Sequence, residues 1–444
     1  MVINPKRGKG TTWWGMGRII YPLLIVFSIF PLSPLCAQEA TLKLSDLIVE
    51  ALKNNPEIKV ASARVQAAGH RIPQAKALSD PMFMIGYENE GTDRLYSFNG
   101  EVKGMPADSR WMFSFSQMLP FPGKLSLKGE MASRDRESLV AMEEYTRRST
   151  VVRVKELYLD LFLSYATIDL LREKTILFAR IEDLALSRYS TGMAPQQEVL
   201  MAQTEKYMLI EKEEMETQKI QSIAAMLAAT LGRNGAQSLT GRPERLSFQS
   251  FPYTLEELIE LARKNSPLVQ AKEKMVKVAE TKVEMAKKEF YPDLTLGASY
   301  FARGSEFPDM WNVTATINLP LYYKDKQKQA LLEAEANLLE AKRELEATNL
   351  MITSSLKDYF SMGKAAERLM NLFQEGLIPK AEQDLEAALS GYAVGKVEAI
   401  TVISRLKSLI DYELQYLKQF VEREKAIARM EGIVGIKDYG GRAK

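Results

Sequence analysis

The stretch from Pro320 to Gly395 constrains the fold of this chain more than any other part of the sequence. It carries a helical pattern of about 67 residues, in which apolar residues recur at seven-residue intervals, at Leu331, Leu338, Leu345, Ile352 and Tyr359, with Phe373 two intervals further on. Such a helix would be roughly 100 Å long at 1.5 Å per residue. A single globular core cannot bury a helix of that length, so the pattern predicts a rod of packed helices.

The same pattern occurs earlier in the chain. Leu119-Pro120 lies 200 positions before Leu319-Pro320 and opens another helical run of about 65 residues that ends at Gly192. Upstream of each run, five residues lie 211 positions before an identical residue: Asn54, Pro56, Ala75, Pro81 and Gly86 match Asn265, Pro267, Ala286, Pro292 and Gly297. These matches predict a tandem duplication of a unit of about 200 residues.

Residues 1–37 have the features of a secretory signal peptide. A basic segment is followed by an apolar core from Ile19 to Leu32 and by the small residue Ala37. We expect cleavage after Ala37; cleavage before Cys36, the only cysteine, would instead allow a lipid to be attached there. After residue 37, no apolar run is long enough for a transmembrane helix, so the exported chain is either soluble or crosses a membrane as a β-barrel.

Each repeat contains two segments that alternate between apolar and polar residues, as strands do. The four predicted strands are Met82 to Glu90, Arg110 to Leu119, Leu294 to Tyr300 and Trp311 to Asn318. This alternation suits a sheet on a soluble core, and it also suits membrane-barrel strands of roughly ten residues. Four strands cannot close a barrel, so in the second case other copies of the chain must complete the sheet.

The repeats give a division of the chain into five parts. We expect a first repeat at 38–232, a connector at 233–253, a second repeat at 254–435 and a polar tail at 436–444, after the signal peptide at 1–37. Each repeat reads as helix, two strands, long helix and short helix, a mainly α fold with a small β part. The first helix is predicted from Leu42 to Leu78, with Ser45 as its N-cap and an interruption at Asn54-Asn55-Pro56.

Two short motifs follow the long helical runs. The first is Arg188-Tyr189-Ser190-Thr191-Gly192 with Glu198-Val199-Leu200 after it, and the second is Gly391-Tyr392-Ala393-Val394-Gly395 with Val402-Ile403 after it. With these motifs and its duplicated unit, nearly all of the mature chain resembles the TolC-like outer-membrane efflux proteins. The segment from Gln117 to Lys124 is similar to its counterpart in the heavy-metal branch of that family, which exports copper and silver or cobalt, zinc and cadmium.

The resemblance implies a homotrimer in the bacterial outer membrane. Its twelve-stranded transmembrane β-barrel would contact outer-membrane lipid and continue into a periplasmic α-helical tunnel, an α-barrel. The tunnel would dock a periplasmic adaptor (membrane fusion protein) and an inner-membrane pump of the resistance-nodulation-division type. The implied function is passive export of metal ions or small toxic molecules. The alternatives are the outlet of a type I protein secretion system and, in a different class, a periplasmic adaptor.

The resemblance also points to residues at the ends of the two hairpins. The adaptor-docking tips would include Tyr189 and Gly192 in the first repeat, and Tyr392 and Gly395 in the second. Each glycine stands where a helix end requires a left-handed residue.

A periplasmic gate is implied at the same end. Tyr392 matches the family's gate tyrosine, and Lys396 is next to Val397, which occupies the place of the family's gate arginine. Thr401 and Ser404 stand where the family has two carboxylates, so Glu198 and Glu398 are the acidic candidates for this gate.

No residue pattern indicates an enzyme, a cofactor or a metal site. His70 is the only histidine, and a duct needs no catalytic group. The 21 methionines lie mostly at the spacing of a helical core, which favours packing over a copper relay. A net charge of +2 gives no reason to expect a nucleic-acid partner.

Overall fold

The computed structural model describes residues 41–89, 101–102, 105–106, 109–234, 239, 241–248, 250–303 and 307–435. The predicted signal peptide with Cys36, and the polar tail at 436–444, lie outside these ranges. All of the described residues belong to one compact unit, which begins at Ala40.

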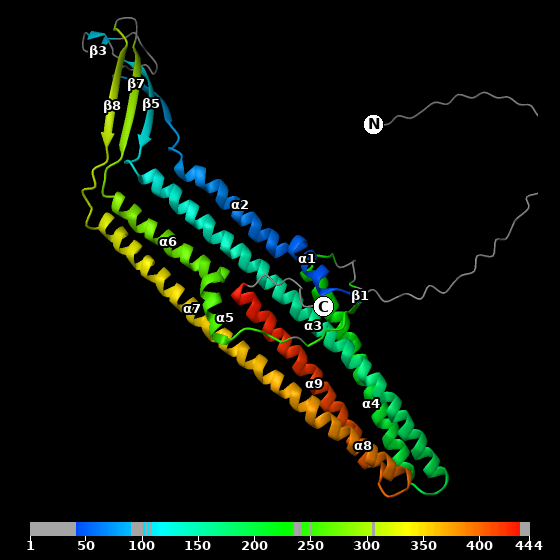
Figure 1. Cartoon of the computed structure of the whole chain (residues 1–444). Helices are drawn as coiled ribbons and strands as arrows, with labels where there is room; N and C mark the ends of the chain where they lie inside the picture. The colour runs from blue at the N-terminus through cyan, green and yellow to red at the C-terminus, as the bar shows by residue number, and fades with distance from the viewer. Residues whose placement is uncertain are drawn as a thin grey trace, which may run out of the picture. The chain divides into compact units, whose positions relative to one another are not determined.

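The element order of the first half recurs in the second (Figure 1). The first half consists of β1 (Thr41–Leu42), α1 (Leu44–Asn54), α2 (Pro56–Lys76), β2 (Met82–Glu88), β3 (Glu101–Val102), β4 (Met105–Pro106), β5 (Arg110–Leu119), α3 (Lys124–Ser190) and α4 (Gln196–Thr230). The second consists of β6 (Arg242–Pro243), α5 (Leu255–Asn265), α6 (Pro267–Lys288), β7 (Leu294–Arg303), β8 (Met310–Ile317), α7 (Gln327–Asn371), the π-helix η1 (Leu372–Leu377), α8 (Ile378–Ala393) and α9 (Ala399–Val434).

The first predicted helix is two helices, and its predicted N-cap was wrong. Helix α1 begins after Lys43, which has no side-chain cap, and Ser45 lies inside the helix with its hydroxyl bonded to Asp46. The start is set by the pairing of Thr41 and Leu42 with the connector strand β6, which leaves only Lys43 as the turn into the helix. The predicted interruption is confirmed as the boundary between α1 and α2.

Asn55 caps α2 and ties it to the end of α4. Its side-chain oxygen accepts hydrogen bonds from the backbone N–H groups of Glu57 (2.8 Å) and Ile58 (3.2 Å), and its side-chain nitrogen donates to the carbonyl of Thr230 (2.7 Å). The side chain therefore stabilises both a helix start and a contact between helices far apart in sequence.

We expect Asn55→Ala to lower the free energy of unfolding by about 2 kcal/mol, since it removes a cap and a partly buried tertiary hydrogen bond, each worth about 1 kcal/mol. Asn55→Asp keeps the capping oxygen and loses the donor, so it should lose about half as much. Urea unfolding in detergent, followed by circular dichroism, measures both. Equal losses for the two variants would contradict the capping role.

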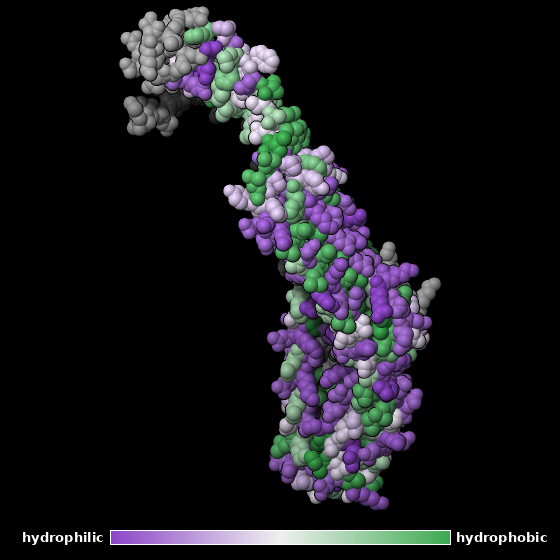
Figure 2. Space-filling model, turned by 90° about the vertical axis from the view of Figure 1, so that its left-hand side faces the viewer, coloured by the Kyte–Doolittle hydropathy of each residue, from purple (hydrophilic) through white to green (hydrophobic). Residues whose placement is uncertain are grey.

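Four of the strands form one antiparallel sheet in the order β2-β5-β7-β8, with register pairs such as Phe115 with Ala298 and Gly297 with Thr314. In the described chain, β2 and β8 each have one edge that pairs with nothing. Residues of β8 are exposed along its whole length, and Trp311 is 77% exposed. Hydrophobic surface also gathers where the strands join the helices (Figure 2). A single copy thus leaves two strand edges open.

The helices are arranged around α3, which runs for 67 residues without a break. The pair α2 and α4 follows one side of α3, and the pair α6 and α9 lies between α3 and α7 (Figure 1). Two shorter helices thus accompany each long one. The second long helix differs from the expectation, because the π-helix η1 separates α7 from α8.

Four ion pairs join α3 to α9, which runs antiparallel to it. They are Lys155–Glu431 (2.7 Å), Glu156–Arg429 (2.6 Å), Asp160–Lys425 (2.7 Å) and Lys174–Glu413 (2.9 Å), and we call them the α3–α9 ladder. Lys174 is only 5% exposed. Burial raises the pKa of the Glu413 carboxyl, and its second oxygen is buried without a hydrogen-bond partner. The ladder connects the first repeat to the second within one chain.

The predicted fold class, mainly α with a small β part, is confirmed. Among the described helices, none combines enough length with enough apolar character to cross a bilayer.

Candidate gate and docking tips

The two long hairpins end in turns of the same construction. Gly192 (φ 73°) follows α3 and Gly395 (φ 76°) follows α8, and each donates its N–H to the carbonyl three residues earlier at 3.0 Å. In each turn the N–H of the residue after the glycine donates to the carbonyl five residues earlier, from Met193 to Arg188 (2.8 Å) and from Lys396 to Gly391 (2.9 Å). This is a Schellman motif, and its left-handed residue favours glycine, as the sequence predicted.

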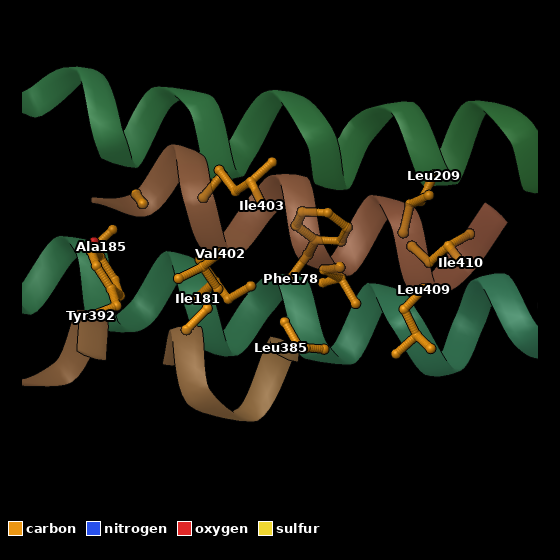
Figure 3. Packing of buried hydrophobic residues seen from close by; sticks show 14 of the residues in the cluster. Phe178, Ile181, Ala185, Leu209, Leu385, Tyr392, Val402, Ile403, Leu409 and Ile410 are labelled. Carbon is orange, nitrogen blue, oxygen red and sulfur yellow. The ribbon is translucent and has the colours of Figure 1, made fainter. Parts of the chain in front are cut away.

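An apolar cluster holds the two hairpins together just above these turns. Figure 3 shows Phe178 and Ile181 of α3 facing side chains from the other three helices, among them Leu385 of α8 and Val402 of α9. Because the cluster takes residues from both repeats, the second hairpin is packed against the first at the tip.

Tyr392 lies at the end of this cluster and is fully buried, at 0% exposure. Its hydroxyl donates a hydrogen bond to the carboxylate of Glu198 on α4 at 2.8 Å. Burial, reinforced by that carboxylate, raises the pKa of the Tyr392 phenol. The phenol therefore stays protonated and remains a donor.

Arg188, at the end of α3, contacts the same tyrosine. Its guanidinium donates to the backbone carbonyl of Tyr392 at 2.6 Å and lies over the Tyr392 ring, 4.5 Å from the centroid. A second nitrogen donates to the carbonyl of Met193 (3.3 Å). We call Arg188, Glu198 and Tyr392 the tip latch, because two residues of the first repeat hold one residue of the second.

Sequence reasoning singled out two members of the tip latch and missed Arg188. That residue was visible only as part of the first tip motif, and its contact is with a tyrosine 204 positions away. A local pattern gives no signal for such a contact. The sequence did show that Val397 occupies the place where the family has an arginine. An arginine elsewhere could therefore have been sought for the same position in space.

The other predicted gate residues lie apart from the latch. Lys396 and Glu398 are exposed, and Glu398 is the N-cap residue of α9, where its carbonyl accepts the N–H of Thr401 (3.1 Å). Tyr189 is also exposed, as are the apolar side chains of Met193 and Val394 at the two turns.

In the part of the chain that the structure describes, His, Cys, Asp and Glu residues form no group of three or more placed to hold a metal ion. His70 is exposed on α2.

The family to which this chain belongs is shown by a comparison with family models. The model described as "Outer membrane efflux protein" matches residues 47–233 and 258–428, well over half of the sequence. The chain is an outer membrane efflux protein. The predicted family, its efflux function and its location in the outer membrane are confirmed.

Two curated relatives of this efflux protein show how far the similarity extends. The cobalt-zinc-cadmium resistance protein CzcC of Cupriavidus metallidurans is 24% identical over 347 residues, which cover 76% of this chain and 81% of CzcC. The cation efflux system protein CusC of Escherichia coli K12 is 23% identical over 409 residues, covering 85% of this chain and 84% of CusC.

Solved structures share the fold of this efflux protein. A CusC crystal structure superposes with a TM-score of 0.77 at 16% identity, covering 92% of this chain and 95% of that one. VceC of Vibrio cholerae gives a TM-score of 0.74 at 20% identity, covering 88% and 96%.

Proposed function

We propose that this outer membrane efflux protein works as a homotrimeric channel-tunnel. Three four-stranded sheets would close a twelve-stranded barrel in the outer membrane, and the helical hairpins would form a tunnel in the periplasm. The observation that carries this proposal is the open sheet: β2 and β8 offer unpaired edges on opposite sides, and Trp311 and its neighbours on β8 are exposed. Pairing β8 of one copy with β2 of the next would satisfy both edges.

The proposed chemistry is passive passage rather than catalysis. An inner-membrane pump and a periplasmic adaptor would deliver the cargo and supply the energy. The two repeats, 38–232 and 254–435, would contribute equivalent parts of the wall, and 233–253 would connect them.

Metal ions are the proposed cargo. Support comes from the relatives, since CzcC is named for cobalt, zinc and cadmium resistance and CusC for cation efflux. A further relative, OpmQ of Pseudomonas putida, is named for pyoverdine export, so small organic molecules are the comparison class.

The test is a deletion strain grown in graded copper, silver, cobalt, zinc and cadmium salts, and separately in small organic toxins. We expect lowered tolerance to one group of metals, restored by the wild-type gene. Unchanged metal tolerance with lowered tolerance to organic toxins would overturn the metal cargo. Tolerance unchanged to all of them, with loss of a secreted protein, would favour a secretion outlet.

The tip latch is proposed as the closed state of the periplasmic gate. It joins the second hairpin, through Tyr392, to Arg188 and Glu198 of the first. Opening the tunnel mouth would require this connection to break so that the second hairpin can move. Lys396 and Glu398 would face water at the mouth.

The turns around Gly192 and Gly395, with the exposed Tyr189, are the proposed adaptor-docking tips. Tyr392, also predicted for docking, has a fully buried side chain and would not face a partner while the latch is closed. A glycine permits close approach of a partner helix. At Gly395 an added Cβ would lie 3.6 Å from the Arg188 guanidinium, and at Gly192 it would meet no atom within 4 Å.

We expect Gly395→Asp to leave trimers intact and to abolish export, because it places a charged side chain on the docking surface. Gly395→Asn is the matched control, since asparagine tolerates a left-handed backbone and adds no charge; it should keep most of the export. Native gels report the trimer and metal tolerance reports export. Normal export by Gly395→Asp would remove this turn from the docking surface.

A further inference from the structure

Helices α4 and α9 are equivalent parts of the two repeats, and their correspondence is fixed at both ends. Each is preceded by a glycine with positive φ, Gly192 or Gly395, and followed by another, Gly232 (φ 76°) or Gly435 (φ 81°). Both pairs of glycines are 203 positions apart. Every residue of α4 can therefore be matched to a residue of α9 without a gap.

Matched residues on the two helices differ sharply in burial. Ile403 and Ile410 of α9 are each 2% exposed, inside the apolar cluster at the tip (Figure 3). Their counterparts on α4, Leu200 and Tyr207, are 52% and 66% exposed. At these two positions α4 carries large apolar side chains, as α9 does, but in the described chain they stay exposed.

The repeat identifies what belongs on that face. Helix α9 is covered by the first repeat's hairpin, through α3 and α4. The equivalent cover for α4 is the second repeat's hairpin, made of η1, α8 and α9. In one chain only α9 of that hairpin is in appreciable contact with α4, so a second copy must supply the cover by η1 and α8. The same offset of 203 joins Tyr189 to Tyr392 and matches Lys174 of α3 with Leu377 of η1.

The contact between α3 and α9 differs in chemistry from the equivalent contact expected on α4. On α9 the α3–α9 ladder uses four charged residues; the matched residues on α4 are Ile210, Ser222, Met226 and Ala228, and none of them is charged. The buried pair of Lys174 with Glu413 is replaced by Leu377 and Ile210, two aliphatic residues.

We propose that the lower part of the subunit interface is an apolar seam in which α4 of one copy packs against η1 and α8 of the next, with Ile210 opposite Leu377. This inference rests on the proposed trimer and adds its register and its chemistry. Repeats within one chain are joined by ion pairs of defined geometry, whereas copies are joined here by apolar contacts, which tolerate sliding because they are not directional.

Cysteine cross-linking tests the seam, because Cys36 is the only native cysteine. In a Cys36→Ser background, Ile210→Cys with Leu377→Cys should be joined between copies by a short bismaleimide, giving dimer and trimer bands on a denaturing gel. Lys174→Cys with Glu413→Cys occupies the matched place inside one chain, so it should react and leave the band at monomer mass. Ile210→Cys with Leu369→Cys, two turns away on α7, should give no bands above the monomer.

The outcomes separate this inference from the proposed function. Trimers on a native gel without the Ile210–Leu377 cross-link, or with equal cross-linking of the Leu369 control, would overturn the seam and leave the channel proposal standing. A monomer in detergent would overturn both. Cross-linked trimers, found together with normal export in a strain that lacks the gene, would support the seam and refute the proposed function.

The lack of charge gives a second measurement. Ile210→Glu should destabilise the trimer, seen as loss of the native trimer band on dilution. Adding Leu377→Lys, which rebuilds the ion pair found inside the chain, should restore that band. Restoration by Leu369→Lys instead would show that Leu369, and not Leu377, lies opposite Ile210, and would overturn the proposed register.

Discussion

Arg188→Ala should open the closed channel. The substitution removes a charge-assisted hydrogen bond to the Tyr392 carbonyl and a cation–π contact, together worth about 3 kcal/mol in each protomer. A loss of that size shifts the balance between closed and open tips by on the order of 100-fold. Single-channel recordings in planar bilayers should show larger conductance, and cells should admit large antibiotics that the wild-type channel excludes.

Two variants show which part of the latch matters. Arg188→Lys keeps the charge and loses the planar group that stacks on Tyr392, so we expect an intermediate conductance. Tyr392→Phe keeps the ring and loses the hydroxyl bond to Glu198, which should also give an intermediate effect. Wild-type conductance in Arg188→Ala would show that the latch does not hold the tip closed.

The largest expected loss of stability comes from Lys174→Ala. Lys174 is buried beside Glu413, and its removal leaves the Glu413 carboxylate largely buried between α3 and α9 without its cation, at a cost of about 3–5 kcal/mol. Thermal unfolding followed by circular dichroism should show a correspondingly lower Tm.

Replacing both partners separates charge from packing. Lys174→Met with Glu413→Leu fills the space with apolar groups, so its free energy of unfolding should lie within about 1 kcal/mol of the wild-type value. Lys277→Ala, which breaks an exposed pair with Glu280, should cost less than about 0.5 kcal/mol. Equal losses for Lys174→Ala and the double variant would mean that packing, and not an unpaired charge, determines the cost.

Sequence periodicity predicted the long helices and the strands well, because both depend on local repetition. The run of about 65 residues expected after Leu119-Pro120 agrees with the 67 residues of α3, and the positive φ of Gly192 and Gly395 agreed with their place in the tip motifs. The duplication supplied the rest, since an element found in one repeat could be expected in the other.

Features that depend on contacts between distant segments could not be predicted in the same way. The seven-residue pattern continues through η1 to Phe373, whose ring lies 6.3 Å from that of Tyr412 on α9, so the pattern gave no sign of a π-helix. Ser45 has the chemistry of an N-cap, but β1 pairs with β6 and places the start of the helix directly after Lys43. Arg188 became a candidate only when the fold brought it to Tyr392.

The position of α3 bears on how such a chain could have arisen. This helix belongs to the first repeat, yet it is covered on one side by α2 and α4 and on the other by α6 and α9. Either repeat expressed alone would leave one side of its long helix bare. An ancestor of half the present length would have carried two strands, so six subunits would have been needed to form the twelve-stranded ring that three form in the proposed assembly. Gene fusion would have halved the number of chains that must assemble.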